Sequence, residues 1–173
     1  MEYNINQSFE ILERTPKTLL AMLSNLSDEW VFSNEGEDTW SPFDVIGHLI
    51  HCEKCDWVTR AKIILSNSED KTFEPFDRFA QFEISKGKTM SQLLSEFLKL
   101  REKNLEYLKS VSITESNYNF TGKHPHLGEV TLKQLLASWV VHDLGHIAQI
   151  SRVMAKQYKS EVGPWKAYLS ILN

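Results

Sequence analysis

The 173-residue sequence lacks the features that mark nucleic-acid-binding, secreted or membrane-spanning chains. No cluster of Lys and Arg stands out and the formal charge is −4, which argues against the basic stripe of a nucleic-acid surface. No apolar run approaches the roughly 20 residues that cross a bilayer. The amino terminus has no basic segment followed by an apolar one, as a signal peptide would. We therefore expect a cytoplasmic protein that binds neither nucleic acid nor membrane.

Cysteine is scarce as well, because Cys52 and Cys55 of the segment CEKC are the only two. A CxxC pair can indicate redox chemistry or zinc binding. This pair lies inside a helical pattern rather than at the start of a helix, and no second CxxC completes a zinc site. Side chains at i and i+3 of a helix also fit disulfide geometry poorly. We expect two reduced, partly buried thiols.

The remaining composition is that of an ordinary globular protein, with 42% apolar and 24% charged residues. At this length we expect a single domain over residues 1–173 with a substantial core. Helical periodicity dominates, and nothing in the sequence predicts a β-hairpin. The predicted helical segments are 6–14, 15–26, 42–65, 89–111, 132–158 and a short docked helix within 162–172. These segments predict an all-α four-helix bundle with short extra helices.

Several caps support the helix boundaries. Thr15 is a predicted N-cap followed by a proline, and Ser41 is another. Thr131 and Gln134 have the spacing of a capping box. The long polar and aromatic connection over 66–88 exceeds the usual loop length, and such connections are usually functional or partly structured.

Two histidines four positions apart, His142 and His146 in WVVHDLGHIAQ, leave the same face of the last long helix. A pair of this kind is more often part of the core than a metal site. It also lacks the glutamate of the H-E-x-x-H protease signature, because Asp143 occupies that position. In a helix bundle, however, a facing helix can supply further ligands. His48 and His51 of IGHLIHCEKC are the candidates.

The residues near His48 are compatible with two kinds of metal site. Positions 48, 51, 52 and 55 share one helix face, so Cys52 could join three imidazoles in a closed structural site. Three imidazoles with water would instead make an open, catalytic site. Cys55 lies two turns from His48, roughly 10 Å along the axis, which is too far for the same ion. Gly47 and Gly145 precede histidines, which indicates either close backbone approach around a site or tight helix packing.

Other polar residues are weaker candidates. Glu53 fits a second-shell or a solvent-facing position equally well. Asp143 could orient a neighbouring imidazole, although pairing with a surface lysine is the favoured interpretation. His124 and His126 flank Pro125 in a segment that could rim the site, and a plain turn is favoured.

Asp77 and Arg78 lie in the long connection and could line the mouth of a site. A structural ion pair between these two adjacent residues is the favoured interpretation.

Taken in order along the chain, several segments together resemble the DinB-like superfamily, which is named for DNA-damage-inducible members. They are TP..LL near the start, WSPFDVIGHLIHCEK.DW..R, FEPFDRFAQF, LLSEFLKLREKNLEYL, HPHLGEVTLKQLLASWVVHDLGHIAQI and GPW..YL. The resemblance covers nearly the whole chain and implies a four-helix bundle of the DinB/YfiT type. It implies that His48, His142 and His146 bind one divalent metal ion, with water completing the shell. His51, Cys52, Glu53 and Asp143 are then possible second-shell or pocket residues.

The resemblance also implies a class of activity. Some relatives are thiol-dependent transferases or isomerases that use small thiols such as bacillithiol or mycothiol, and dimers are common among them. We therefore expect a metal-dependent enzyme, with zinc or nickel as the most suitable ions, acting on a small molecule and activating a thiol. A metal-dependent hydrolase, which activates water, and a non-catalytic metal- or ligand-binding bundle are the alternatives.

Overall fold

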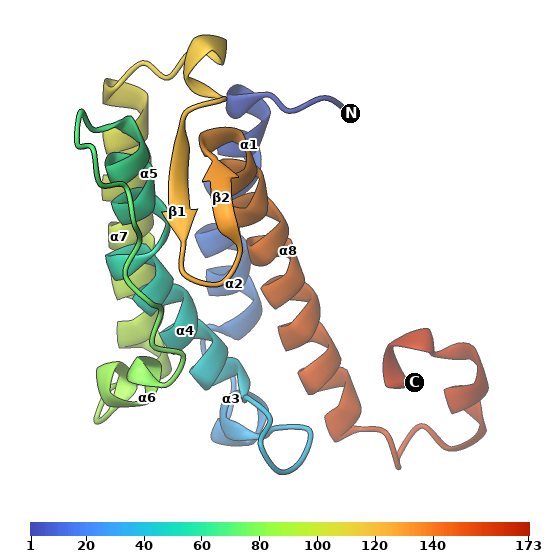
Figure 1. The fold of residues 1–173 in the computed structure, drawn as a ribbon. Coiled ribbons are helices and arrows are strands. Elements are labelled where there is room, and N and C mark those ends of the chain that lie inside the picture. The colour runs from blue at the N-terminus through green and yellow to red at the C-terminus, as the bar shows by residue number, and fades with distance from the viewer.

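Four helical columns form the body of the molecule, as Figure 1 shows for a computed structural model that describes residues 1–173. The columns are α1 (Ile5–Leu12) with α2 (Thr15–Leu23), α4 (Pro42–Cys55) with α5 (Trp57–Leu65), α7 (Met90–Ser110), and α8 (Leu132–Gln157). The short elements between them are α3 (Asp28–Phe32), α6 (Ala80–Ser85) and the 3-10 helix η1 (Glu115–Asn117). The predicted all-α four-helix bundle is confirmed. No helix is both long enough and apolar enough to span a membrane.

The predicted caps fix the starts of two site-bearing helices. Ser41 Oγ accepts a hydrogen bond from the backbone N–H of Asp44, whose carboxylate accepts from the N–H of Ser41. Thr131 and Gln134 make the same reciprocal box at the start of α8. The predicted N-cap at Thr15 is wrong, because the chain stays helical before it and Thr15 is already inside α2.

The predicted helix over 42–65 is interrupted at Asp56, which separates α4 from α5. Its φ of −107° and ψ of −89° leave the helical region. The backbone hydrogen bonds Asp56 N–H to Cys52 and Arg60 N–H to Asp56 continue across the break, so the column stays almost continuous. The interruption is confined to one residue, and the apolar spacing on both sides remains helical.

A β-hairpin that the sequence did not predict covers one side of the bundle. Strand β1 (Thr121–His124) pairs antiparallel with β2 (Gly128–Thr131). The hairpin packs through Gly122, where a Cβ would overlap the ring of buried Phe73. Each strand has only four residues, which is too short for a period-2 pattern to stand out. These two strands form the whole sheet, so the fold remains predominantly helical.

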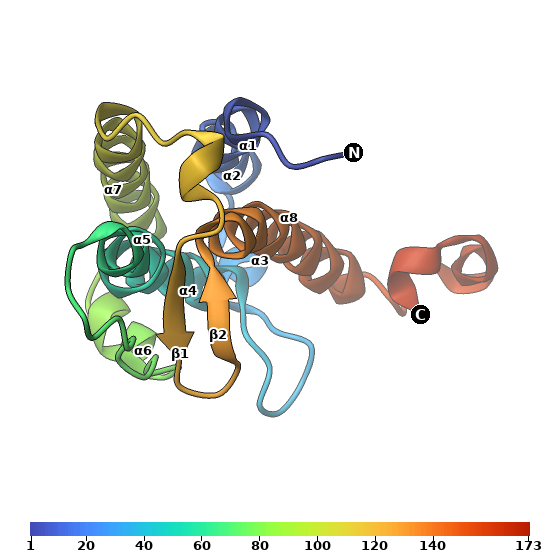
Figure 2. The same cartoon turned by 45° about the horizontal axis from the view of Figure 1, so that its top comes forward.

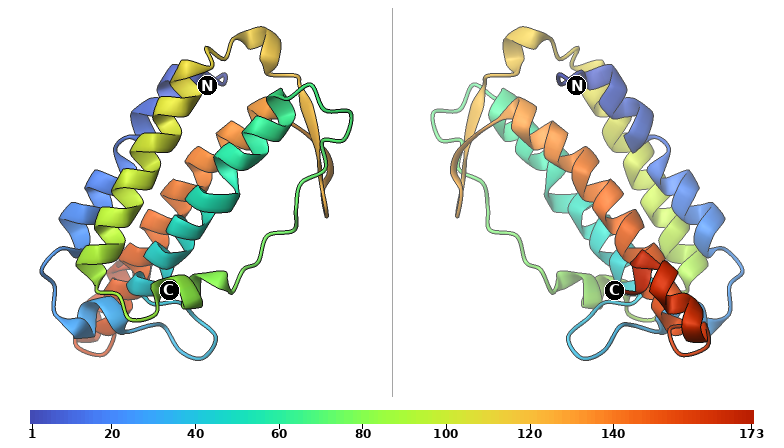
Figure 3. Two further views of the ribbon diagram at one scale, coloured as in Figure 1. Left: turned by 90° about the vertical axis from the view of Figure 1, so that its left-hand side faces the viewer. Right: turned by 90° about the vertical axis from the view of Figure 1, so that its right-hand side faces the viewer.

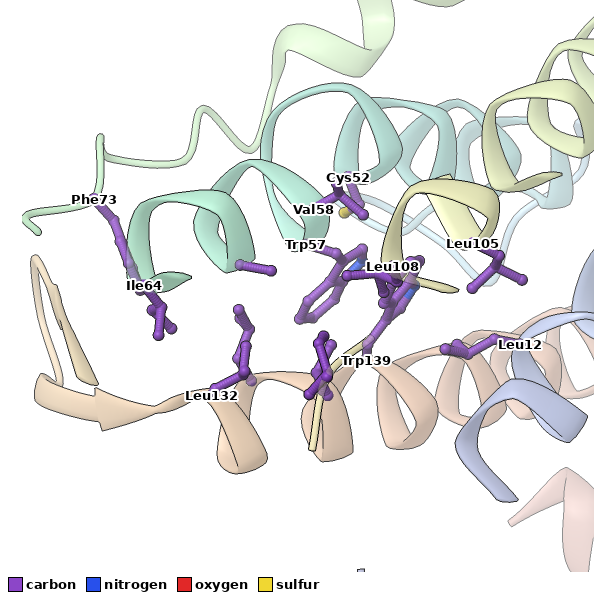
Figure 4. Packing of buried hydrophobic residues seen from close by; sticks show 14 residues of the cluster. Leu12, Cys52, Trp57, Val58, Ile64, Phe73, Leu105, Leu108, Leu132 and Trp139 are labelled. Carbon is purple, nitrogen blue, oxygen red and sulfur yellow. The ribbon is translucent and has the colours of Figure 1, made fainter. Parts of the chain in front are cut away.

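Two apolar clusters fill the bundle. Figure 4 shows the larger one, in which the Trp57 and Trp139 rings stack with centroids 5.9 Å apart. The second cluster lies toward the other end of the bundle, between α2, α4, α7 and α8. Figure 3 shows the α4–α5 column beside α8, and α7 beside the α1–α2 column. The site described below lies where α4 and α8 face each other.

The chain beyond α8 differs from the docked helix that the sequence predicted. It forms two 3-10 helices, η2 (Gly163–Tyr168) and η3 (Ser170–Leu172). Figures 1 and 2 show this segment near one end of α8 and away from the other columns. Leu172 is buried, but Trp165 and Tyr168 are 71% and 84% exposed. Only its last turn is therefore docked.

Candidate metal centre

The three histidines identified in the sequence converge at the interface of α4 and α8. The Nε2 atom of His142 lies 3.1 Å from that of His48 and 3.1 Å from that of His146. One ligand atom from each of the three lies within 4.8 Å of the others. The helical spacing of four brings the pair on α8 together, and the packing of α4 against α8 adds His48.

All three imidazoles are held in the neutral form that a metal requires. Burial is the main cause that lowers the pKa of His48 to about 4 and that of His142 to about 3, and His146 contributes to both shifts. Burial also lowers the pKa of His146 below its ordinary value. A metal ion binds an unprotonated imidazole nitrogen, so near neutral pH these side chains need lose no proton to bind one.

Two glutamines set the orientation of the outer rings. The Nδ1 of His48 lies 3.2 Å from Oε1 of Gln81 on α6, and the Nδ1 of His146 lies 2.8 Å from Oε1 of Gln149. An amide oxygen only accepts, so each Nδ1 carries the proton and each Nε2 presents its lone pair to the cluster. Second-shell acceptors of this kind orient the histidines of metal sites.

The spacing of the nitrogens fits a single ion. Ligand nitrogens at 2.0–2.1 Å from a tetrahedral zinc lie roughly 3.3 Å from one another. The two separations that involve His142 are both 3.1 Å, which is close to this value, and all three ligand atoms lie within 4.8 Å of one another. Nδ1 of His142 is buried and has no partner, so no hydrogen bond opposes the ring orientation. The three histidines therefore fit one divalent ion with an open fourth position.

Cys52 lies beside this cluster but outside it. Its Sγ is 3.5 Å from Nε2 of His48, and the group that could hold an ion contains only the histidines. Burial raises the pKa of the Cys52 thiol above its ordinary value, whereas metal coordination needs a thiolate. The geometry thus favours the open site over the closed structural one.

His51 and Cys55, the other candidates on α4, lie outside the histidine cluster. His51 packs its ring against Phe76, with centroids 4.6 Å apart, and is not part of the cluster. Sγ of Cys55 lies 3.5 Å from the ring of His51, and Cys55 is exposed rather than partly buried. Both cysteines are free, as predicted. The four positions expected on one face therefore divide into an inner pair and an outer pair.

Glu53 and Asp143 turn away from the cavity and meet a residue that sequence reasoning missed, Arg101 of α7. Arg101 donates to Glu53 at 2.8 and 2.9 Å and to Asp143 at 2.6 and 3.1 Å. The three side chains are 0–1% exposed. Burial opposes the charge of Arg101, but the two carboxylates raise its pKa above its ordinary value. The expected pairing of Asp143 with a surface lysine is therefore wrong.

The two glycines beside histidines behave differently. A Cβ at Gly47 would overlap Oγ of Ser85, so this glycine lets α6 lie directly on α4 and brings Gln81 to His48. A Cβ at Gly145 would meet nothing within 4 Å. The close approach suggested by the sequence is therefore present at Gly47 and absent at Gly145.

A cavity of about 1040 Å³ opens above the histidines. Aromatic rings enclose the cluster, because Trp40 and Phe76 pack against His48 with centroids 4.9 and 5.7 Å away. His124 and His126, expected in a plain turn, belong to the hairpin and line the cavity. The cavity has aromatic walls but most of its lining residues are polar or charged, and its volume is large enough for a small molecule.

The carboxyl groups lining the cavity differ in acidity. Burial raises the pKa of Asp56 to about 6, against the opposing effect of Arg60 at 2.8 Å. Glu35 has its pKa lowered to about 2 by hydrogen bonding to Arg152. Asp56 is therefore the cavity carboxyl group whose raised pKa lies closest to neutrality.

Replacing Gln149 with leucine is expected to weaken metal binding about 10- to 100-fold, the usual effect of removing a second-shell acceptor. The His146 ring would lose its 2.8 Å partner and with it the preference for the Nδ1–H form. Competition with a chromogenic chelator measures the affinity. Gln157→Leu, on the same helix but hydrogen bonded to Asn34 and Val153, is the matched control. Equal affinities for both variants would contradict the assigned role.

Acid is expected to release the metal over a range that extends well below the ordinary imidazole pKa of about 6.5. Protons compete for the same nitrogens, and the lowered values of about 4 for His48 and about 3 for His142 delay that competition. Affinity should therefore change little down to well below pH 6.5 and fall steeply as the pH approaches about 4. Equilibrium dialysis followed by elemental analysis checks this, with His51→Ala as the control. Complete release above pH 6.5 would be inconsistent with buried neutral imidazoles.

Comparison with known proteins gives one family and one fold. A family model described as the DinB superfamily matches residues 11–150, a range that includes all three histidines. Among solved structures, the chain is similar to YfiT from Bacillus subtilis, described as a probable metal-dependent hydrolase with an unusual four-helix bundle topology. The TM-score is 0.74 at 20% identity, over 88% of this chain and 86% of that one. No curated protein matches significantly.

Proposed function

Because this chain belongs to the DinB superfamily, we propose that it is a metal-dependent hydrolase that holds one divalent ion on His48, His142 and His146. The observation that carries the proposal is the convergence of three neutral imidazoles beneath an open cavity with no fourth protein ligand. Structural zinc sites are normally closed by four protein ligands, whereas catalytic sites keep a position for water. The description of the structurally similar YfiT as a probable metal-dependent hydrolase supports the same class.

The ion would supply the nucleophile, since a bound divalent metal lowers the pKa of water to about 7. The residues of the chain perform the other tasks. Gln81 and Gln149 orient the outer imidazoles. Trp40 and Phe76 cover the His48 ring and limit the access of bulk water. Three imidazole ligands suit zinc or nickel among the available divalent ions.

Asp56 is assigned as the proton acceptor of this site. It lines the cavity, and a carboxyl group with a pKa of about 6 is mainly ionised at neutral pH yet basic enough to take a proton. Asp56→Asn is expected to lower kcat about 100-fold while leaving metal content unchanged. Steady-state kinetics and elemental analysis on the same preparation test this. Equal loss of metal and activity would indicate a structural role instead.

A thiol-dependent transferase, the activity expected from the sequence, would use the same ion to lower the pKa of a thiol. No residue of the cavity identifies a thiol partner, and the comparison favours hydrolysis. The two reactions differ in the nucleophile, so they can be separated experimentally.

The test is a screen of zinc- and nickel-loaded protein against aryl esters, amides and halogenated electrophiles, each with and without cysteine or glutathione. The proposal expects turnover that needs the metal and no thiol. Turnover only in the presence of a thiol would make the protein a transferase. Full metal occupancy without turnover of any substrate class would favour a metal-binding bundle without catalysis.

A further inference from the structure

We propose that the substrate is a small carboxylate with an apolar body, and that Arg78 binds its carboxylate group. This inference rests on the proposed function in one respect, because only an enzyme would make the bound ligand a substrate. The subsite itself depends on residues of the cavity that take no part in holding the metal.

Arg78 is distinguished by its lack of an ion pair. Three arginines line the cavity. Arg60 pairs with Asp56 at 2.8 Å, and Arg152 pairs with both carboxylate oxygens of Glu35 at 2.8 Å. Arg78 makes no ion pair with any carboxylate, including the adjacent Asp77. The ion pair expected from the sequence is therefore absent, and one guanidinium group at the cavity is uncompensated.

The position of Arg78 relates it to the metal centre. It lies in the segment between α5 and α6, which Figure 3 shows running along one side of the bundle down to α6. Two residues earlier, the ring of Phe76 packs against His48. Arg78 and the three histidines line the same cavity. A ligand bound by this guanidinium would therefore occupy the cavity that opens onto the histidine cluster.

The segment that carries Arg78 is held in place by the contact of α6 with α4. Gly47 permits the close approach of Ser85, and Gln81 reaches His48 from the same short helix. Arg78 itself is exposed at the cavity wall. A guanidinium fork matches the two oxygens of a carboxylate, which favours Arg over Lys in such a role.

The apolar part of the ligand is inferred from aromatic side chains that do not belong to the core. Phe79 and Phe82 line the cavity and are 71% and 43% exposed. Their rings stack on each other with centroids 6.5 Å apart. Two exposed phenylalanines beside an unpaired arginine suit a ligand that combines a ring or alkyl chain with an anion.

One residue argues for the opposite charge preference. Asp38, in the loop before α4, also lines the cavity and forms no ion pair. A divalent ion on the three histidines would add positive charge to the cavity, so we expect the anion to prevail. An ammonium ligand that uses Asp38 is an outcome that the experiment must be able to detect.

The experiment compares three probes of the same shape, 3-phenylpropionate, 3-phenylpropionamide and 3-phenylpropylamine. Isothermal titration measures their binding to zinc-loaded protein and to the same protein after chelation. The carboxylate is expected to bind at least about tenfold more tightly than the amide in both forms, because its hydrogen bonds to Arg78 are charge-assisted. Arg78→Gln should remove this difference and leave amide binding unchanged.

Lys86→Gln is the matched control, because Lys86 is an exposed cation at the end of α6 that does not line the cavity. Equal affinity for the carboxylate and the amide, or a carboxylate preference that survives Arg78→Gln, would overturn the proposal. Tighter binding of the amine would assign the charge preference to Asp38 instead. A preference confined to zinc-loaded protein would mean that the metal alone binds the anion. Binding to the chelated protein is measured without any turnover. The test of Arg78 can therefore be read even if the hydrolase screen finds no activity.

Discussion

Arg101→Ala is expected to lower the free energy of unfolding by about 3–5 kcal/mol, the typical cost of leaving a buried charge without its partner. Glu53 and Asp143 would remain fully buried with no counter-charge, and the carbonyl of Leu12 would lose its donor at 2.9 Å. For a chain of this length the change corresponds to a fall in Tm of about 10 °C. Urea denaturation monitored by circular dichroism measures it.

Two controls separate the buried charge from the loss of a long side chain. Lys109→Ala removes an exposed ion pair with Glu13 and should cost less than about 1 kcal/mol. Replacing Arg101, Glu53 and Asp143 together with apolar residues should lower the free energy of unfolding less than Arg101→Met alone. The triple replacement leaves no unpaired carboxylate in the core. If Arg101→Ala were as stable as the wild type, Glu53 and Asp143 would not depend on Arg101 for their charge balance.

His142→Ala is expected to abolish metal binding and to reduce metal-dependent turnover at least about 1000-fold, since the two remaining imidazoles hold a divalent ion poorly against water. His142 is the central member of the cluster, with Nε2 3.1 Å from both other histidines. His48→Ala and His146→Ala should have similar effects. Elemental analysis of protein purified without chelators, together with the hydrolase assay, provides the measurement.

The neighbouring candidates supply the controls for this variant. His51→Ala and Cys52→Ala should retain about one ion per chain, because neither belongs to the cluster that could hold it. Far-UV circular dichroism of each variant shows whether the bundle remains folded. Full metal content in His48→Ala together with loss in Cys52→Ala would replace the three-histidine assignment with a closed site that includes the thiolate.

The bundle and the histidine cluster were predictable from the sequence because both follow from helical spacing. His142 and His146 are one turn apart, and capped apolar segments define the helices that carry them. His48 required the additional pattern of the superfamily, since periodicity alone cannot tell which of His48 and His51 faces α8. The sequence also favoured a transferase, whereas YfiT, the protein of similar fold, is described as a probable metal-dependent hydrolase.

The partners of the cluster were not predictable, for reasons that differ from residue to residue. Gln149 is three residues from His146 on α8 and could have been found from helical spacing. Gln81 reaches His48 from a connection without periodicity, so only the docking of α6 reveals it. Arg101 stands among charged residues in REKN, a context typical of a solvent-facing turn of helix. Its burial depends on meeting two carboxylates from other helices.

If the three histidines hold an ion as proposed, their separation along the chain would link metal supply to folding. His48 and His142 are 94 residues apart, so the complete set of ligands exists only after α4 and α8 have packed. In an unfolded chain, only His142 and His146 are close enough in sequence to bind the same ion, and two imidazoles bind it weakly. An ion at about 100 times its Kd would therefore add about 2.7 kcal/mol to the folded state through mass action. Cellular metal availability would then control how much of the protein persists as well as how much of it is active.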